Sequence, residues 1–423
     1  MLRAPLVGLA ALVLLIGTAT PARAAQPYPV AFHRFELSTG SVSGLTRTSG
    51  SLVIGSGTTS GTYIDPYGKK DPVAYDAGTW TSDWLTTTGS DGAPFSELVA
   101  SWNAVTPEGT WLQTRMQART DKGTTTKWYI LGRWTFGDGT IYRTSVGGQG
   151  DADGFVAIDT FFAKDHLMTA YRLEVTLYRA QGSGLTPRLD FIGAVASNAP
   201  NLNPYVPSAH DPAATGVLDV PTYSQEIHAG QYPQFDSGGE AWCSPTSTSM
   251  ILRYWLPNQP PASDYGYVLT DYPDTQDPWV DYAARYTFDY HYQGAGNWPF
   301  NAAYAAHFGL RGFVTQLRSL YEAEQFIKAG IPLVASIAFT SNKLDGFLFK
   351  STGGHLLTIV GFTASGDVMS NDPASRTDGT VKHVYDRQQF ERDWLSSTGG
   401  IVYVIRPAST ALPANIANQP ANW

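Results

Sequence analysis

Residues 238–255 read GGEAWCSPTSTSMILRYW and contain Cys243, the only cysteine in a chain of 423 residues. Two glycines precede the cysteine, and Pro245 follows it at a position that suits the first turn of a helix. The apolar residues that come next are spaced for one buried face, which predicts a helix over residues 244–256. The thiol is therefore expected at a helix N-terminus, where backbone amides and the helix dipole favour thiolate over thiol.

The first 25 residues have the pattern of a secretory signal peptide. An apolar run over residues 5–16 follows Arg3 and is too short to span a bilayer comfortably. Small residues in Ala22-Arg23-Ala24 then form a cleavage site, so residues 1–25 are predicted to be removed. No later stretch is long and apolar enough for a membrane helix. The mature protein is expected to be secreted, extracellular and without a membrane span.

A lone cysteine has two interpretations in an exported protein. It cannot form a disulfide within its own chain, so it is either an inert buried residue or a thiol kept for chemistry. Free cysteine often packs as a small hydrophobe, and composition alone favours the inert interpretation. Cys243 stands at a predicted helix start after paired glycines, not inside an apolar run. This position favours a reactive thiol.

The composition suits two domains with sizeable cores. Hydrophobic residues make up 43% of the chain, aromatic residues 13% and charged residues only 15%. Low charge with abundant Gly, Ser and Thr favours β-rich structure over long surface helices. The formal net charge is −8 and there is no basic run. Nucleic acid and anionic membranes are therefore not expected as partners.

Residues 26–198 are predicted to form an all-β sandwich of jelly-roll type. Residues 171–177 (YRLEVTL) alternate between apolar and polar, which marks a half-buried strand. Residues 111–119 and 127–136 are further strand-like runs, and glycine-containing turns separate them. The six tryptophans of this half are expected to be mostly core, although some could offer a platform for glycan contact. They are Trp80, Trp84, Trp102, Trp111, Trp128 and Trp134.

Two segments have compositions that are typical of chain outside folded domains. Residues 199–216 are rich in Pro, Asn and Ala and are predicted to be a linker. Residues 408–423 have a similar composition and are expected to form a flexible tail.

Residues 217–407 combine helical and strand patterns, with helices first and a mostly antiparallel sheet after them. This order predicts an α+β domain. The expected helices lie at 244–256, 299–308, 319–329 and 387–395, and the expected strands at 333–339, 355–362, 367–371, 381–385 and 401–405.

A nucleophilic thiol needs a base, and the base needs a group that fixes its tautomer. His355 follows Gly353-Gly354 and opens an apolar strand, where its ring can face a cleft. Asp372 comes just after the predicted hairpin partner of that strand, so the hairpin brings Asp372 back beside His355. The other histidines are interpreted as ordinary surface or core residues.

Acyl transfer also needs donors for an oxyanion. The backbone amide of Cys243 is one candidate. A glutamine side chain upstream is the other, and Gln225, Gln231 and Gln234 all qualify on chemistry alone.

Five short motifs occur in order along residues 215–407. They are Val220-Pro221 with Gln225, Trp242-Cys243-Ser244-Pro245-Thr246, Ala329-Gly330-Ile331-Pro332, Gly354-His355-Leu356-Leu357-Thr358-Ile359-Val360-Gly361 and Asn371-Asp372-Pro373. In this order they resemble the C39-type cysteine peptidases, which have a papain-like fold. The resemblance implies Cys243 as nucleophile, His355 as base and acid, Asp372 as orienting residue and Gln225 as oxyanion donor.

The chain departs from the family pattern in two places. Ser244 stands where the family usually has glycine, and Gln225 is farther from the cysteine than usual, which leaves Gln234 as the alternative. The chain shows neither membrane helices nor a phosphate-binding loop, so it resembles the secreted, stand-alone members and not those within ATP-driven exporters.

The expected function is a cysteine hydrolase that cleaves a peptide or amide bond in a peptide or protein. Acyl transfer, or cleavage of cell-wall peptide, on the same three residues is one alternative. A non-catalytic surface or glycan-binding protein with a relic papain-like domain is another. No cofactor and no metal are expected: scattered histidines give no zinc spacing, and Asp151 and Asp153 are interpreted as a turn, not a calcium site.

Overall fold

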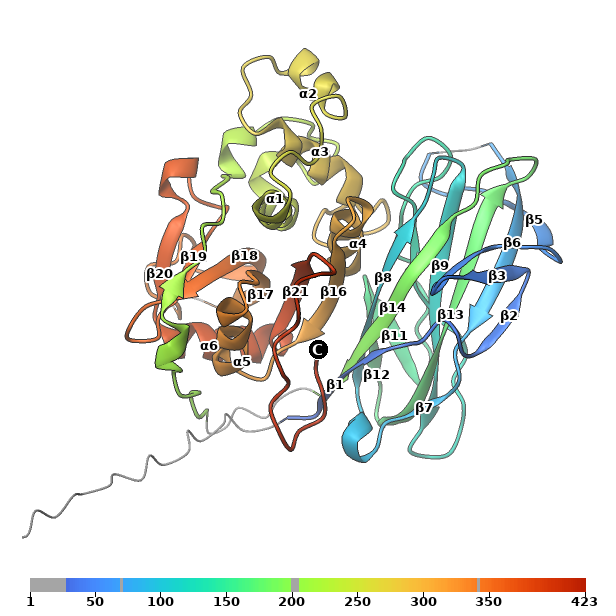
Figure 1. Cartoon of the computed structure of the whole chain (residues 1–423), viewed down its shortest axis with the longest axis horizontal. Coiled ribbons are helices and arrows are strands. Elements are labelled where there is room, and N and C mark those ends of the chain that lie inside the picture. Colours follow the sequence, from blue (N-terminus) through green and yellow to red (C-terminus); the bar gives the residue numbers. More distant parts are fainter. Residues whose placement is uncertain (1–27, 69–70, 199–204, 341–342) are drawn as a thin grey trace, which may run out of the picture.

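The computed structural model describes residues 28–68, 71–198, 205–340 and 343–423. It consists of two halves that pack side by side: one is built of strands, and the other combines helices with a sheet (Figure 1). The predicted signal peptide, residues 1–25, lies outside the described residues. Within the described ranges, no helix has both the length and the apolar character needed to cross a bilayer.

The first half is a sandwich of two seven-stranded antiparallel sheets. Leu173, Val175 and Leu177 are fully buried between the sheets, as their alternation predicts. The first sheet runs in the order β11 (Gly154–Ala157), β12 (Thr160–Ala163), β8 (Glu97–Val105), β14 (Arg188–Ser197), β4 (Ser51–Ile54) and β3 (Leu45–Thr48), with β1 (Val30–Arg34) also on β14. The second runs β10 (Tyr129–Trp134), β9 (Thr110–Thr120), β13 (Met168–Ala180), β6 (Val73–Thr81) and β2 (Ser41–Ser43), with β5 (Thr59–Tyr63) on β6 and β7 (Leu85–Thr86) on β13.

The second half contains a third antiparallel sheet covered by helices. Its strand order is β16 (Arg311–Gln316), β21 (Ile401–Arg406), β17 (Leu333–Phe339), β18 (Thr352–Phe362), β19 (Val368–Asn371) and β20 (Lys382–Tyr385), with β15 (Gly216–Val217) on β18. The helices are α1 (Cys243–Trp255), α2 (Gly266–Asp271), α3 (Pro278–Thr287), α4 (Trp298–His307), α5 (Leu320–Lys328) and α6 (Arg387–Thr398).

The helices and strands expected in this half are confirmed within a few residues at their ends. The sequence pattern missed α2, α3 and β16. The helix α3 begins at Pro278 after Asp277, and it buries Val280, Ala283 and Ala284 at helical spacing, a signal that the sequence prediction overlooked. The α+β order is confirmed, and it places α1 against β18, the strand that carries His355.

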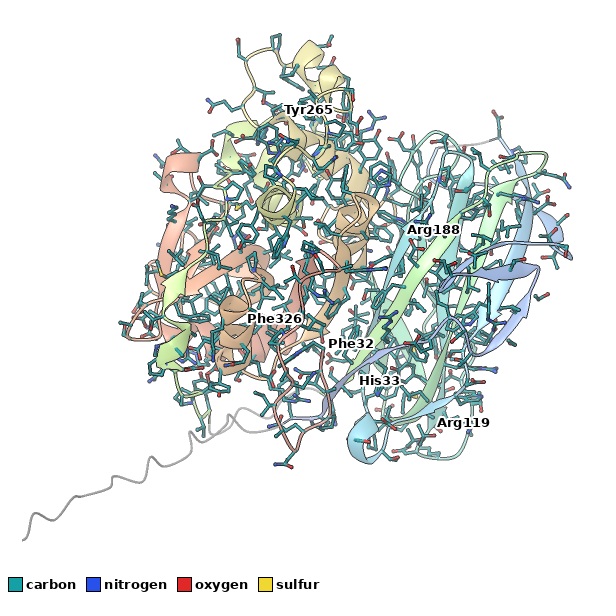
Figure 2. All side chains as sticks on the ribbon, viewed as in Figure 1. Phe32, His33, Arg119, Arg188, Tyr265 and Phe326 are labelled. Carbon is teal, nitrogen blue, oxygen red and sulfur yellow. The ribbon has the colours of Figure 1, made fainter. Side chains whose placement is uncertain are left out.

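The two halves share one continuous hydrophobic core. The strand β8 of the sandwich packs against α4 and β16, and Trp102 meets Phe300 edge-on with ring centroids 6.2 Å apart. Phe32, labelled between the halves in Figure 2, packs against Phe313 with ring centroids 4.8 Å apart. Asn103 donates a hydrogen bond to the Gly312 carbonyl at 2.6 Å. The sandwich is therefore fixed in position relative to the second half.

The segments expected to be loose are held by side chains where the structure describes them. Tyr205 and Ser208, in the predicted linker, donate hydrogen bonds to Glu391 of α6. The tail differs from its prediction: Asn422 and Trp423 are buried, and the Asn422 amide donates to the Gln316 carbonyl at 2.8 Å. Composition indicated flexibility, but it does not reveal that buried amide and aromatic side chains anchor the segment.

Candidate active site

Cys243 is the first residue of α1, as its position before Pro245 predicts. The preceding Trp242 is fully buried, and its indole N–H donates a hydrogen bond to the Phe235 carbonyl at 2.7 Å. Cys243 itself is half-buried and lines a cleft. The chain is thus anchored immediately before the cysteine, while the thiol remains accessible.

The two glycines before the cysteine allow a close approach of two backbones. Gly238 has φ of +101°, a conformation that favours glycine. A side chain at Gly239 would meet backbone atoms of His228 and Gln225 at 2.4 and 2.5 Å. Only glycine fits there, and its small size places the Gln225 segment directly against the turn that leads into Cys243.

The β18–β19 hairpin brings together the predicted base and its orienting residue. The two strands pair in antiparallel register, and Asp372 follows the last residue of β19. The Nε2–H of His355 donates a hydrogen bond to Asp372 Oδ1 at 2.8 Å, and both side chains are buried. Because Asp372 occupies Nε2, Nδ1 is the ring nitrogen left for the thiol.

Asp372 has two further donors. The Tyr385 hydroxyl, at the end of β20, donates to Asp372 Oδ2 at 2.8 Å. The backbone N–H of Ala374 donates to Oδ1 at 3.1 Å. These bonds fix the carboxylate plane and hence the His355 ring. Sequence reasoning did not identify Tyr385, because nothing in the local pattern of β20 relates it to Asp372.

The electrostatics of the pair favour a charged imidazolium. Burial alone lowers the pKa of His355, but the charge and hydrogen bond of Asp372, followed by interaction with Cys243, raise it to about 10. Burial raises the pKa of Asp372, but His355 and then the Tyr385 hydroxyl lower it below its usual value. These shifts favour a protonated histidine and an ionised carboxylate at neutral pH.

Of the three glutamines, the structure brings Gln225 to Cys243. Gln225 is buried and lines the cleft, and its backbone N–H donates to the Pro373 carbonyl at 2.8 Å. Its side-chain amide donates to the Glu240 carbonyl and to Glu226 Oε1. Gln234 is exposed and does not line the cleft, and the Gln231 side chain bonds to Thr275 elsewhere. The sequence alone did not distinguish among these three glutamines.

Ser244, which departs from the family pattern, lies away from the cleft. It is buried, and its hydroxyl is 3.0 Å from the Tyr403 hydroxyl on β21. The serine side chain therefore occupies the interior of the second half, and the cleft surface beside Cys243 is unaffected by it.

The cleft has a volume of about 500 Å³ and is lined by both halves of the molecule. Cys243, His355 and Gln225 lie in its lining together with residues of the β11–β12 hairpin of the sandwich. Within the described residues, no group of three His, Cys, Asp or Glu side chains is arranged to hold a metal ion.

Models of two families match the chain. The model described as Peptidase_C39 like family matches residues 217–402, and the one described as Peptidase C39 N-terminal domain matches residues 31–197. This chain belongs to the C39-like peptidase family. Membership indicates a peptidase-like function in general, and the first half matches the model described as the N-terminal domain of C39 peptidases. No curated protein matches the sequence significantly.

Solved structures resemble this C39-like protein only remotely. The CBM22-1–GH10 modules of Clostridium thermocellum endo-1,4-beta-D-xylanase 10B, complexed with xylohexaose, are 9% identical, with a TM-score of 0.19 over 48% of this chain and 32% of that chain. A carbohydrate-binding module of the β-sandwich superfamily is 12% identical, with a TM-score of 0.17 over 38% of this chain and 56% of that chain. This chain thus spans about a third of the first structure's length, and these matches are too remote to indicate a function.

The tryptophans considered for glycan contact are mostly core, as expected. Trp80, Trp102, Trp111 and Trp134 are fully buried. The half-buried pair Trp84 and Trp128 is covered by guanidinium groups. These contacts are Arg119 and Arg172 on Trp84 at 4.3 and 4.8 Å, and Arg115 and Arg172 on Trp128 at 4.8 and 4.9 Å. Arginine therefore occupies the ring faces that a sugar would use.

Proposed function

We propose that this protein is a secreted cysteine peptidase that hydrolyses peptide bonds with a Cys243–His355–Asp372 triad on a papain-like fold. The observation that carries the proposal is His355, which is held by Asp372 on one side and interacts with Cys243 on the other. The packing of the cysteine helix α1 against the strand of the histidine supports the papain-like arrangement. We further propose residues 26–198 as a jelly-roll-like domain, 199–216 as linker and 217–407 as the catalytic domain.

The reaction follows from this geometry. The Cys243 thiolate attacks the carbonyl carbon, and the π electrons of the C=O bond move to oxygen. The backbone N–H of Cys243 and a side-chain N–H of Gln225 stabilise this oxyanion. The Gln225 N–H that bonds to Glu226 in the free protein is the one that turns to the oxyanion, since the other is held by the Glu240 carbonyl.

Collapse of the tetrahedral intermediate breaks the C–N bond. The His355 imidazolium gives its proton to the leaving amine, and a thioester remains on Cys243. Neutral His355 then takes a proton from water, which attacks the thioester carbonyl. Expulsion of the thiolate releases the carboxylic acid product and restores the thiolate–imidazolium pair. An amine in place of water would give acyl transfer.

The direct test is the rate at which iodoacetamide alkylates the native protein. Cys243 is the only cysteine, so the label reports on one site. We expect labelling at pH 7 to be faster than that of the urea-unfolded chain, and His355→Ala to remove the difference. Turnover of a peptide library by wild type, and its loss in Cys243→Ala, completes the test. Slow labelling without turnover contradicts the proposal, and glycan binding in that case favours the non-catalytic alternative.

Secretion has its own test. Expression of the full chain in a secreting host should yield protein in the medium whose N-terminal sequence begins near residue 25. Protein retained in the cell with an intact N-terminus contradicts secretion.

A further inference from the structure

A hairpin of the sandwich lines the cleft that contains the candidate catalytic residues. Its lining includes residues 157–160, which run from the end of β11 through the turn to the start of β12, and also Phe162 of β12. Cys243 and His355 belong to the same cleft. The sandwich therefore contributes directly to the surface that a substrate would touch, in addition to packing behind it.

The tip of this hairpin is anchored to the second half. Asp159 is buried and accepts a hydrogen bond from the backbone N–H of Trp298, the first residue of α4, at 2.7 Å. The Thr160 hydroxyl donates to the same carboxyl at 2.9 Å. Burial raises the pKa of Asp159 to about 7, although both hydrogen bonds favour the charged form. A carboxylate at a helix N-terminus is favourable, and it holds the hairpin in place.

Ile158 has an unusual backbone conformation at this tip. Ala157 pairs with Thr160, so Ile158 is the first of two central turn residues, where a positive φ favours glycine. Its φ is +57°, which a β-branched residue adopts only under strain. The half-buried side chain lines the cleft. Strain of this kind persists where the side chain has a use that glycine does not serve.

The remaining walls of the cleft are aromatic and acidic. The second half contributes Tyr292, Trp298 and Phe349, which are half-buried or exposed. Among the described lining residues, the titratable side chains other than Cys243, His355 and Tyr292 are carboxyl groups. These are Asp159, Asp236 and Glu240. Such a surface suits apolar side chains and repels acidic ones.

We infer that the sandwich supplies one wall of the substrate cleft, and that Ile158 selects peptides with a bulky apolar side chain at that wall. The inference rests on the proposed peptidase function and names its substrate class: apolar segments without an acidic residue near the cleaved bond. Asp159 is a positioning residue, because it acts through the hairpin that it anchors.

The test uses Ile158→Gly in the full chain. Glycine suits the positive φ, so the melting temperature should stay the same or rise, which separates the effect from misfolding. The probes are N-acetylated, C-amidated peptides in which each position in turn is Leu, Gly or Asp. We expect wild type to prefer Leu over Gly at one position by about tenfold or more in kcat/KM. Ile158→Gly should remove most of that preference.

Ile64→Gly is the matched control. Ile64 is 61% exposed on the sandwich and does not line the cleft, so its replacement should leave the preference unchanged. An undiminished Leu preference in Ile158→Gly, with activity intact, overturns the inference. Equal loss of preference in both variants also overturns it, because it would show a general effect on the sandwich.

A binding measurement separates this inference from the proposed function. Calorimetry with the same peptides on Cys243→Ala does not require turnover. If wild type neither labels nor cleaves, yet Cys243→Ala binds the Leu peptides best and Ile158→Gly abolishes this, the peptidase proposal fails and the subsite stands. If Cys243→Ala binds Leu and Gly peptides equally, the subsite is wrong whatever the turnover.

Discussion

Two buried histidine–aspartate pairs lie in the second half of the molecule. His355 contacts Asp372 at 2.8 Å, and His228 Nδ1 lies 2.9 Å from Asp281 Oδ2. All four side chains are buried. The distances are almost equal, yet only His355 lines the cleft with Cys243. A buried His–Asp pair alone therefore does not mark a candidate active site, and the position of His355 in the cleft beside Cys243 is what distinguishes it.

The carboxylates of the two pairs have pKa shifts in opposite directions. Burial raises the pKa of Asp281, and His228 opposes this without offsetting it. The contact with His228 is close but not aligned as a hydrogen bond, and both Asp281 oxygens lack a hydrogen-bond partner. Asp372 instead accepts from Tyr385 and Ala374 as well as His355, and its pKa is lowered. Additional donors are what keep a buried carboxylate ionised.

The largest effect should come from removing the histidine of the cleft. In the proposed mechanism His355→Ala deprives Cys243 of its proton acceptor and donor, so kcat/KM for peptides should fall by about 10⁴-fold. Thermal unfolding should change much less than activity. The measurement is peptide turnover beside a circular dichroism melt. If His355→Ala keeps kcat/KM within tenfold of the wild-type value, the His355–Asp372 pair has no catalytic role that distinguishes it from His228–Asp281.

The corresponding change in the other pair should affect stability instead. His228→Ala leaves Asp281 buried without its partner, and the free energy of unfolding should fall by about 3 kcal/mol. Urea denaturation measures this loss. Iodoacetamide labelling, expressed per folded molecule, should stay near the wild-type rate. A strongly reduced rate in folded protein would show that His228 also serves the thiol.

The pH profile tests the charge of Asp372. The pKa of His355 is raised to about 10 in the folded protein, above its unfolded value of 6.5, so the stabilisation it gives is complete below 6.5 and is lost as pH rises through about 10. The alkaline limit of activity should therefore lie near pH 10. Asp372→Asn keeps an acceptor oxygen but removes the charge, and it should move this limit to lower pH. An unmoved limit in Asp372→Asn means that another group sets it.

The smallest effect concerns the extra donor that distinguishes the two carboxylates. Tyr385→Phe removes one hydrogen bond to Asp372, and kcat/KM should fall by roughly 5- to 10-fold, about 1 kcal/mol. The pKa of Asp372 should rise, so the acid limit of stability should move to higher pH. Tyr403→Phe is the control, since its buried hydroxyl contacts Ser244 and not the triad. Equal effects of both variants on the acid limit would count against a specific role of Tyr385.

Local sequence determined much of the fold and of the candidate site. The glycines and Pro245 around Cys243 marked a helix start, because both act through backbone conformation. The strand pattern from His355 and the turn at Gly366 fixed a hairpin that returns Asp372 to the histidine. Alternation marked the sandwich strands, because one face of each strand must be buried. These features depend on residues close together in the chain.

The tertiary structure decided what depends on distant segments. Of the three candidate glutamines, Gln225 lies at the cleft, because Gly239 lets its backbone approach the turn before Cys243. Tyr385 and the β11–β12 hairpin reach the site through sheet pairing and packing between the halves, which no local pattern encodes. The His228–Asp281 pair joins a 3-10 turn to a helix that the sequence analysis did not predict. Contacts between such segments arise only when the whole chain has packed.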